Sequence, residues 1–218
     1  RLAERTVPSP LFRKKVTIEK KYCAHSDAGT GWGFGSFWIT GDKCYYIQEE
    51  WTDDEKELIE KENLLFEDKK GVLHKMGINF LEMATVGMTL ETAKGNFQEK
   101  DFTFFCDNET SVKILNSYRT RTLPFATLLE NIDENMSMYQ LNIEFKHIRS
   151  EDNIESDWLS RGLEHLDDFF KYIKKTYNVS SFVHMKVAEG HRDLAKIVRQ
   201  AKKHPEWIVA DGRGSDGQ

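Results

Sequence analysis

The sequence predicts an α/β fold built on a mixed five-stranded sheet, with flanking helices and a helical extension at its C-terminal end. Residues 20–50 contain three consecutive strand-like segments separated by glycine-containing turns, which is typical of an antiparallel meander. Residues 102–106 are a short apolar run, as expected for a central strand covered on both faces. Helical patterns then alternate with strands, so the expected order of elements is βββαβααβα.

The turns mark the first three strands. The first strand is expected at residues 22–26, and the glycines of GTGWGFG begin a tight turn after it. The aromatic segment 32–38 is expected to form the second strand. Residues 40–43, Thr-Gly-Asp-Lys, then form a hairpin turn into a third strand at 44–48.

A charged insertion separates this meander from the first long helix. Residues 52–77 are rich in Asp, Glu and Lys but contain apolar residues at amphipathic spacing, which predicts an insertion with one short surface helix. Asn79 is then expected to cap a helix that runs from Phe80 to about Lys94, with apolar residues at helical spacing.

Strands and helices alternate in the second half of the domain. The strand at 102–106 ends at Asp107, and the clean alternation of residues 141–146 predicts a half-exposed strand. A helix capped by Asp152 or Asn153 follows this last strand and carries Asp157. The remaining helices are expected at residues 111–118, 124–135, 163–177 and 184–203.

These elements divide the chain into one domain and three flanking parts. The parts are an extended N-terminal arm, an α/β domain, a helical extension and a flexible tail, at residues 1–19, 20–162, 163–204 and 205–218. Because the chain begins with Arg1 rather than Met, we also expect it to be a piece of a longer protein.

Composition narrows the class of protein. Hydrophobic residues make up 39% of the 218 residues and charged residues 31%, which is the balance of a globular protein without a membrane span. Cys23, Cys44 and Cys106 are odd in number and widely spaced, which indicates buried thiols in a reducing intracellular compartment, the nucleus or the cytoplasm. The net charge of −5 does not favour unaided binding of nucleic acid, so such binding is expected to need a local patch or a partner domain.

Four carboxylates stand where a predicted strand ends or a predicted helix begins. They are Asp27, Glu82, Asp107 and Asp157. An α/β fold brings residues at such positions to one edge of its sheet. Carboxylates that converge repel one another unless cations lie between them. The pattern therefore predicts a divalent-metal site that acts on phosphodiesters.

Short phrases surround the four acids, and together they resemble one known family. DAGTGWGFG contains Asp27, INFLEM contains Glu82, CDN contains Asp107 and NIESDWLSR contains Asp157. In this order they resemble the D-A-S-x-x-G-W-G-A, I-N-x-L-E-L, T-D-N and N-x-x-A-D-x-L-S-R segments of the ribonuclease H domain that follows reverse transcriptase in retroelements. The tract YRTRT at 118–122 also resembles a G-x-R-S tract of tyrosine-recombinase retrotransposons.

This resemblance implies a ribonuclease H-like fold and a divalent-metal-dependent endonuclease that hydrolyses the RNA strand of RNA–DNA hybrids. The four carboxylates would be catalytic and would hold two Mg²⁺ ions, for which Mn²⁺ could substitute. Asp27 would bridge both metals, and Asp107 would share the ion that bears the attacking water. Glu82 and Asp157 would complete the other site. The implied partner is a reverse transcriptase domain or another part of a polyprotein.

The resemblance also implies residues that contact the substrate or assist the reaction. Ala28, Gly29, Asn79 and Asn108 would contact the hybrid, where the 2′-hydroxyl distinguishes RNA from DNA. Cellular members of the family place a histidine in the loop before the last helix. The matching loop here, HIRSEDN, offers His147 and Arg149 as accessory residues, with a strand position as the alternative for His147.

Two other functions fit parts of the sequence. The acidic balance and the charged insertion also suit a domesticated, catalytically weak ribonuclease H-like module that serves as an RNA-binding or protein-interaction scaffold. Retention of four mutually repelling carboxylates speaks against that alternative. A resolvase- or integrase-like nuclease acting on DNA is the second alternative, and the DN and D-x-L-S-R phrases favour the retroelement enzyme over it.

Overall fold

The computed structural model describes residues 22–60, 65–67, 73–75, 77–97, 101–120 and 123–188, together with positions 190, 192 and 194. It is an α/β structure with a six-stranded mixed sheet in the order β7-β6-β1-β2-β3-β8. The predicted α/β class is therefore confirmed, and this main sheet has one strand more than the five expected. The N-terminal arm and the tail predicted at 205–218 lie outside the described residues.

The predicted meander forms the centre of the sheet. Strands β1 (Cys23–Ala28), β2 (Gly33–Thr40) and β3 (Lys43–Glu50) follow one another and pair antiparallel. The hairpin between β2 and β3 turns at Gly41, whose φ of 63° is a conformation that glycine adopts without steric cost.

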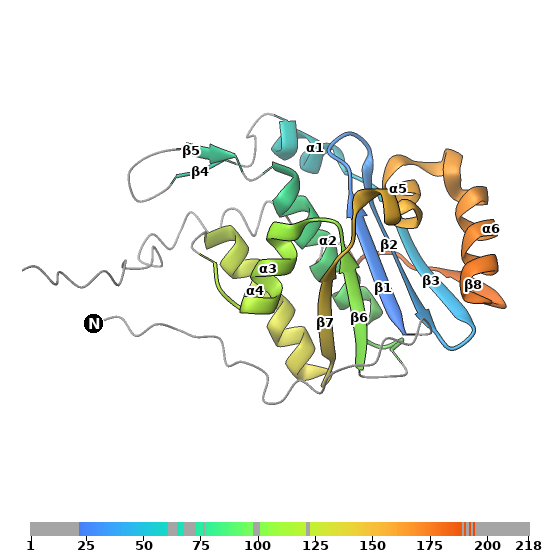
Figure 1. Cartoon of the computed structure of the whole chain (residues 1–218). Coiled ribbons are helices and arrows are strands. Elements are labelled where there is room, and N and C mark those ends of the chain that lie inside the picture. The colour runs from blue at the N-terminus through green and yellow to red at the C-terminus, as the bar shows by residue number, and fades with distance from the viewer. Residues whose placement is uncertain are drawn as a thin grey trace, which may run out of the picture.

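Two further strands extend the sheet beside β1. Strands β6 (Asp101–Cys106) and β7 (Asn142–His147) run parallel to β1, in the register Ser26↔Cys106 and Cys106↔His147. Because the carboxyl ends of parallel strands meet at one edge, the ends of β1, β6 and β7 lie side by side (Figure 1).

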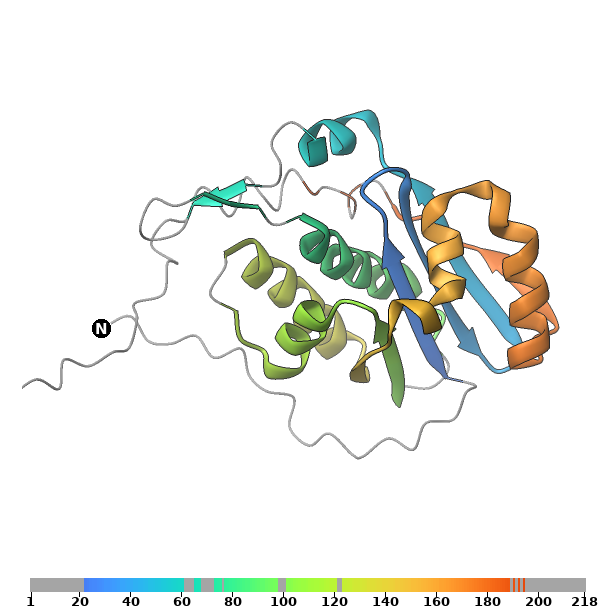
Figure 2. The same ribbon diagram turned by 45° about the horizontal axis from the view of Figure 1, so that its top comes forward.

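Helices cover both faces of the sheet (Figure 2). Helices α2 (Gly77–Ala93), α3 (Glu109–Ser117) and α4 (Leu123–Met138) lie on one face. Helices α5 (Ile154–Arg161) and α6 (Leu166–Tyr177) lie on the other. All five correspond to predicted helices.

Alternation along the strands sorts the side chains between two apolar cores. Phe34 and Phe104 belong to the core beneath α2, α3 and α4. Phe37 and Cys44 belong to the core beneath α5 and α6, where Phe37 meets Phe169 edge-on at 5.7 Å between ring centroids. Period-two alternation thus assigns each strand residue to one helical layer.

The segment after β3 contains more structure than predicted. The short helix α1 (Asp53–Glu60) is present, but strands β4 (Leu65–Glu67) and β5 (Leu73–Lys75) also form an antiparallel hairpin. Strands of three residues are too short to show a periodic pattern in the sequence. The expectation that Asn79 caps α2 was wrong, because the helix begins at Gly77 and Asn79 lies in its first turn.

The C-terminal extension differs from the prediction at residue 184. A strand, β8 (Ser181–His184), pairs parallel with β3, and residues 185–188 are not helical, so the helix expected from 184 does not begin there. Most of the rest of that expected helix lies outside the described residues. Phe182 packs against Phe170 at 4.7 Å between ring centroids, and the strand covers the edge that β3 would otherwise expose. The remaining short elements are the 3₁₀ turns η1 (Ser150–Asp152) and η2 (Leu163–His165).

Helix α5 lies directly on the backbone of β2, and the contact point is a glycine. A Cβ at Gly35 would stand 2.6 Å from the carbonyl carbon of Leu159 and 2.8 Å from the amide nitrogen of Ser160. These are backbone atoms of α5, so only movement of the whole helix could relieve the clash. Gly35 therefore sets how closely α5 approaches the sheet.

We expect Gly35→Ala to destabilise the protein by about 2 kcal/mol, because the added methyl group must push α5 away from a packed surface. Urea-induced unfolding measures the change. Gly95→Ala is the matched control, since no atom lies within 4 Å of a Cβ at Gly95. Equal stability of the two variants would contradict the close packing of α5.

Candidate metal centre at the carboxyl edge of the sheet

Asp27 is the central acid of the site and is held by a hydroxyl from α5. It lies one residue before the end of β1 and is 7% exposed. The Ser160 hydroxyl donates a hydrogen bond to Asp27 Oδ2, and Ser160 Oγ also lies 3.0 Å from the carbonyl oxygen of Asp157. Ser160 thus connects the acid on the sheet to the helix turn that carries the fourth acid.

Glu82 reaches the same point from α2, on the opposite face of the sheet. Its side chain is buried, and its Oε1 accepts a hydrogen bond of 3.2 Å from the amide of Ala28. Its Oε2 lies 3.8 Å from Cys106 Sγ, and its carboxyl group is also within hydrogen-bonding reach of Asp27. Two acids from different elements therefore share one buried region.

Asp107 completes this cluster, while Asp157 lies at its margin. Asp107 directly follows β6 and is half-buried. Glu82, Cys106 and Asp107 each offer one ligand atom, and these atoms lie within 4.8 Å of one another. Asp157 is close enough for its negative charge to raise the pKa of Asp27. Its Oδ1 also accepts a 2.6 Å hydrogen bond from Arg161 Nε. The structure thus gathers three of the predicted acids and places the fourth beside them.

The electrostatics of the cluster reflect burial and like charge. Burial raises the pKa of Asp27 to about 6, and the negative charges of Asp107 and Asp157 add to this, whereas the Ser160 hydrogen bond opposes it. The pKa of Glu82 is raised well above its ordinary value by burial and then by the charges of Asp27 and Asp107. Burial likewise raises the pKa of the Cys106 thiol. The site therefore favours protonated groups or the approach of a cation.

A buried polar contact fixes the start of α5 against β1. Asn153 Nδ2 donates a 3.1 Å hydrogen bond to the carbonyl oxygen of Ser26, and its Oδ1 lies 3.4 Å from His25 Nδ1. His25 stacks on Phe37 at 4.7 Å between ring centroids, and burial lowers its pKa to about 4. Asn153 occupies the position before α5, but its side chain makes no capping hydrogen bond. Of the two predicted capping residues, Asn153 instead bonds the neighbouring strand, and Asp152 Oδ2 accepts a hydrogen bond from Arg149 Nε.

The four residues expected to contact substrate are located close to the acids but already have partners. The amide of Gly29 donates to the carbonyl oxygen of Gly33 at 2.8 Å, and the Ala28 amide is used by Glu82. Asn108 caps α3 by accepting a 2.9 Å hydrogen bond from the Ser111 amide, and its Nδ2 donates to Asn79 Oδ1 at 2.7 Å. Asn79 and Asn108 thus form one linked pair beside Asp107.

The two accessory candidates lie in different surroundings. His147 is exposed, ends β7, and places its Nε2 3.2 Å from the carbonyl oxygen of Asp107. Arg149 pairs instead with Glu151 and Asp152, at 2.6 and 2.7 Å, and is 68% exposed. Of these two residues, only His147 lies at the edge of the acidic cluster.

Three residues of the site were missed in the sequence: Cys106, Asn153 as a link to β1, and Ser160. Ser160 stands three positions after Asp157, a spacing that places both on one side of a helix, and this was the available signal. Cys106 directly precedes Asp107, but alternation along a strand predicts that neighbouring side chains point to opposite faces. The chain bends at Asp107, directly after β6, and the ligand atoms of both residues lie within 4.8 Å of each other.

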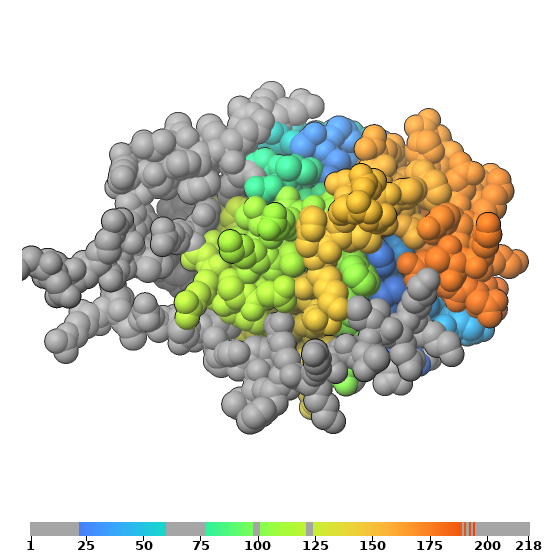
Figure 3. Space-filling model, viewed as in Figure 1, coloured from blue at the N-terminus to red at the C-terminus, as the bar shows by residue number. Residues whose placement is uncertain are grey.

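The surface around the site is formed by segments from distant parts of the chain. In the space-filling view, α5 lies over the strands of the meander, beside the segment that contains α3 (Figure 3).

None of the helices in the described part of the chain has the length and apolar character that a membrane span requires. No protein-family model, curated protein or solved structure matches this chain.

Proposed function

We propose that the protein is a ribonuclease H-like endonuclease that hydrolyses the RNA strand of RNA–DNA hybrids with the help of two divalent metal ions. The observation that carries this proposal is the meeting of Glu82 and Asp107 at the carboxyl edge of the sheet, where their ligand atoms lie within 4.8 Å of each other and the charges of Asp107 and Asp157 act on Asp27. These acids come from two strand ends and two helices on opposite faces, so surface charge alone does not account for their meeting.

The residues present fit Mg²⁺, with Mn²⁺ as a substitute. Carboxylate oxygens are the ligands that such hard cations prefer. Burial and mutual repulsion raise the pKa values of Asp27 and Glu82, and a bound divalent ion would relieve that repulsion. When bound, the ions supply Lewis-acid stabilisation of negative charge on the phosphodiester and lower the pKa of water. Asp27, Glu82, Asp107 and Asp157 are the residues that would hold them.

The chain itself supplies orientation around these ligands. Ser160 fixes one oxygen of Asp27, and the Ala28 amide fixes one oxygen of Glu82, so neither carboxylate rotates freely. Packing of α5 at Gly35 holds Ser160 and Asp157 against the strands. His147, exposed beside the carbonyl of Asp107, is the residue we assign an accessory role at the rim.

The sheet topology supports the same family assignment. One antiparallel strand, β2, lies beside β1, while β6 and β7 continue the sheet in parallel, and helices cover both faces. This arrangement is compatible with a ribonuclease H-like sheet, to which β8 adds an edge strand. The phrases DAGTGWGFG, INFLEM, CDN and NIESDWLSR surround the four acids in the order that the resemblance requires.

Substrate contacts and partners belong to the same proposal. The linked amides of Asn79 and Asn108 lie beside Asp107. We propose that they contact the minor groove of a hybrid, where the 2′-hydroxyl would identify the RNA strand. A net charge of −5 leaves little general attraction for nucleic acid. We therefore propose a reverse transcriptase domain, or another part of a polyprotein, as the partner that contributes affinity.

We expect Asp107→Asn to reduce cleavage of a labelled RNA–DNA hybrid by more than about 100-fold, because loss of a ligand costs more than loss of an outer-shell partner. The assay compares hybrid, duplex RNA and duplex DNA, each with Mg²⁺, Mn²⁺ or chelator. Asp101→Asn is the matched control, since Asp101 is exposed at the opposite end of the same strand. Wild-type cleavage by Asp107→Asn would reject the catalytic assignment. No cleavage of any duplex by the folded wild-type protein would favour the scaffold alternative.

A second prediction concerns stability without metal. The pKa of Asp27 is raised from 3.8 to about 6 in the folded state, so the folded protein binds the proton more tightly than the unfolded chain does. The contribution of Asp27 to stability is therefore fully present below about pH 4 and is lost as the pH rises through about 6. In chelator at pH 7.5, we expect Asp27→Asn to be more stable than wild type by about 2 kcal/mol, with the difference shrinking towards pH 4.

Thermal unfolding across this pH range measures the effect, again with Asp101→Asn as the control. Adding Mg²⁺ should raise the melting temperature of the wild type more than that of Asp27→Asn, because binding stabilises only a competent folded site. A stability difference that ignores both pH and Mg²⁺ would contradict the assignment of Asp27 as a buried metal ligand.

A further inference from the structure

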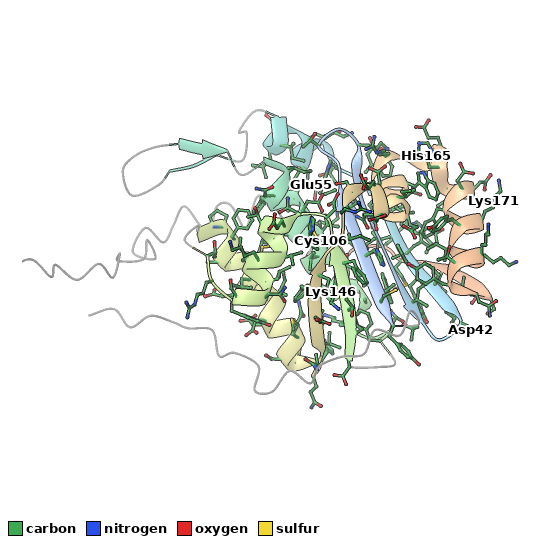
Figure 4. All side chains as sticks on the ribbon, in the orientation of Figure 1. Asp42, Glu55, Cys106, Lys146, His165 and Lys171 are labelled. Atoms are coloured by element: carbon green, nitrogen blue, oxygen red, sulfur yellow. The ribbon has the colours of Figure 1, made fainter. Side chains whose placement is uncertain are left out.

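A buried thiol lies among the carboxylates of the site. Cys106 is the last residue of β6 and is fully buried, at 0% exposure. It lies at the carboxyl end of that strand, in the interior of the molecule (Figure 4). Its Sγ is 3.8 Å from Glu82 Oε2, and the ligand atoms of Glu82, Cys106 and Asp107 lie within 4.8 Å of one another. The site therefore offers a sulfur donor together with two oxygen donors.

The spacing of these donors fits a cation that binds sulfur. A tetrahedral zinc site has Zn–S distances of about 2.3 Å and Zn–O distances of about 2.1 Å, which places sulfur and oxygen about 3.6 Å apart. The observed separation of Cys106 Sγ and Glu82 Oε2 is 3.8 Å. Mg²⁺ takes oxygen ligands and would leave the thiol unused, whereas Zn²⁺ and Cd²⁺ bind thiolate strongly.

A second, independent observation points to a ligand at this place. Ser26 is the register partner of Cys106 on the adjacent strand β1, so the two side chains lie next to each other on the same face of the sheet. Ser26 is 0% exposed, and its hydroxyl oxygen has no hydrogen-bond partner within the described part of the chain. A buried polar group without a partner is costly, and a water or ion beside the thiol would satisfy it.

We propose that Glu82, Cys106 and Asp107 form a binding site for a thiophilic divalent cation of the Zn²⁺ or Cd²⁺ class. Binding forms a metal–sulfur bond and releases the thiol proton to solvent. Since Glu82 and Asp107 are shared, such a cation excludes Mg²⁺ from both. Binding of the thiophilic ion stands by itself, and its inhibitory consequence rests on the proposed nuclease function.

Cd²⁺ titration tests the binding step. Cys23 and Cys44 belong to the core on the opposite face, so the double variant Cys23→Ala/Cys44→Ala keeps Cys106 as the single thiol. We expect this protein to bind one Cd²⁺ and to develop thiolate-to-metal charge-transfer absorption in the ultraviolet. Adding Cys106→Ser should abolish the absorption and weaken Cd²⁺ binding at least tenfold. Unchanged affinity, or no charge-transfer absorption when Cys106 is present, would overturn the proposal.

Further variants separate metal binding from folding. Glu82→Gln keeps the thiol but replaces a negatively charged carboxylate ligand with a neutral amide, so it should weaken Cd²⁺ binding at least tenfold while some thiolate absorption persists. Cys106→Ala replaces Cys106→Ser if the latter does not fold, as judged by thermal unfolding in chelator. Full-affinity Cd²⁺ binding by Glu82→Gln would show that the thiol acts without the cluster and would reject the proposed site.

A competition experiment separates this proposal from the proposed function. Excess Mg²⁺ should weaken Cd²⁺ binding to the double variant. Zn²⁺ should inhibit Mg²⁺-supported cleavage of the hybrid less in Cys106→Ser than in wild type, when the rate of each protein is compared with its own rate without Zn²⁺. If the protein cleaves no duplex but binds Cd²⁺ through Cys106, the nuclease proposal fails and the thiophilic site stands. If the protein cleaves the hybrid but shows no thiolate absorption when Cd²⁺ is added, the thiophilic site is rejected and the nuclease proposal stands.

Discussion

The parallel pairing of β1 with β6 is the interaction on which the rest of the site depends. It places Ser26 opposite Cys106, so the next residues along, Asp27 and Asp107, leave the sheet at the same edge. An antiparallel pairing would send the two acids to opposite ends of the molecule. Helices α2 and α5 pass this edge on opposite faces of the sheet, and they bring Glu82 and Asp157 beside the two strand-end acids.

Gathering acids in a buried place is unfavourable, and the surrounding contacts show how the fold tolerates it. The hydroxyl of Ser160 and the amide of Ala28 each stabilise one carboxylate, and the link from Asn153 to β1 fixes the beginning of α5. These hydrogen bonds orient the acids but do not cancel the cost of their burial and mutual repulsion, because the pKa values of Asp27 and Glu82 stay raised. A folded protein that retains such repulsion gains most from binding a cation.

The donor set makes the choice of cation a property of this particular chain. With oxygen ligands alone, the cluster would favour hard ions such as Mg²⁺. Cys106 adds sulfur on the side of Glu82 and Asp107, so two donor sets overlap in one place. Because they share ligands, occupation of one by a thiophilic ion would prevent occupation of the other, and the metals available would then govern the proposed nuclease activity.

The sequence by itself determined the α/β class, the meander, the helices α1 to α6 and the four acids as candidates, because turn chemistry, periodicity and short phrases are local properties. Only the tertiary structure decided which side chains surround those acids. Ser160 and Cys106 have unremarkable local patterns, and their roles depend on how α5 docks at Gly35 and how β6 pairs with β1. The edge strand at 181–184 was missed for the same reason: four residues carry too little periodicity, and the open edge of β3 supplies the pairing.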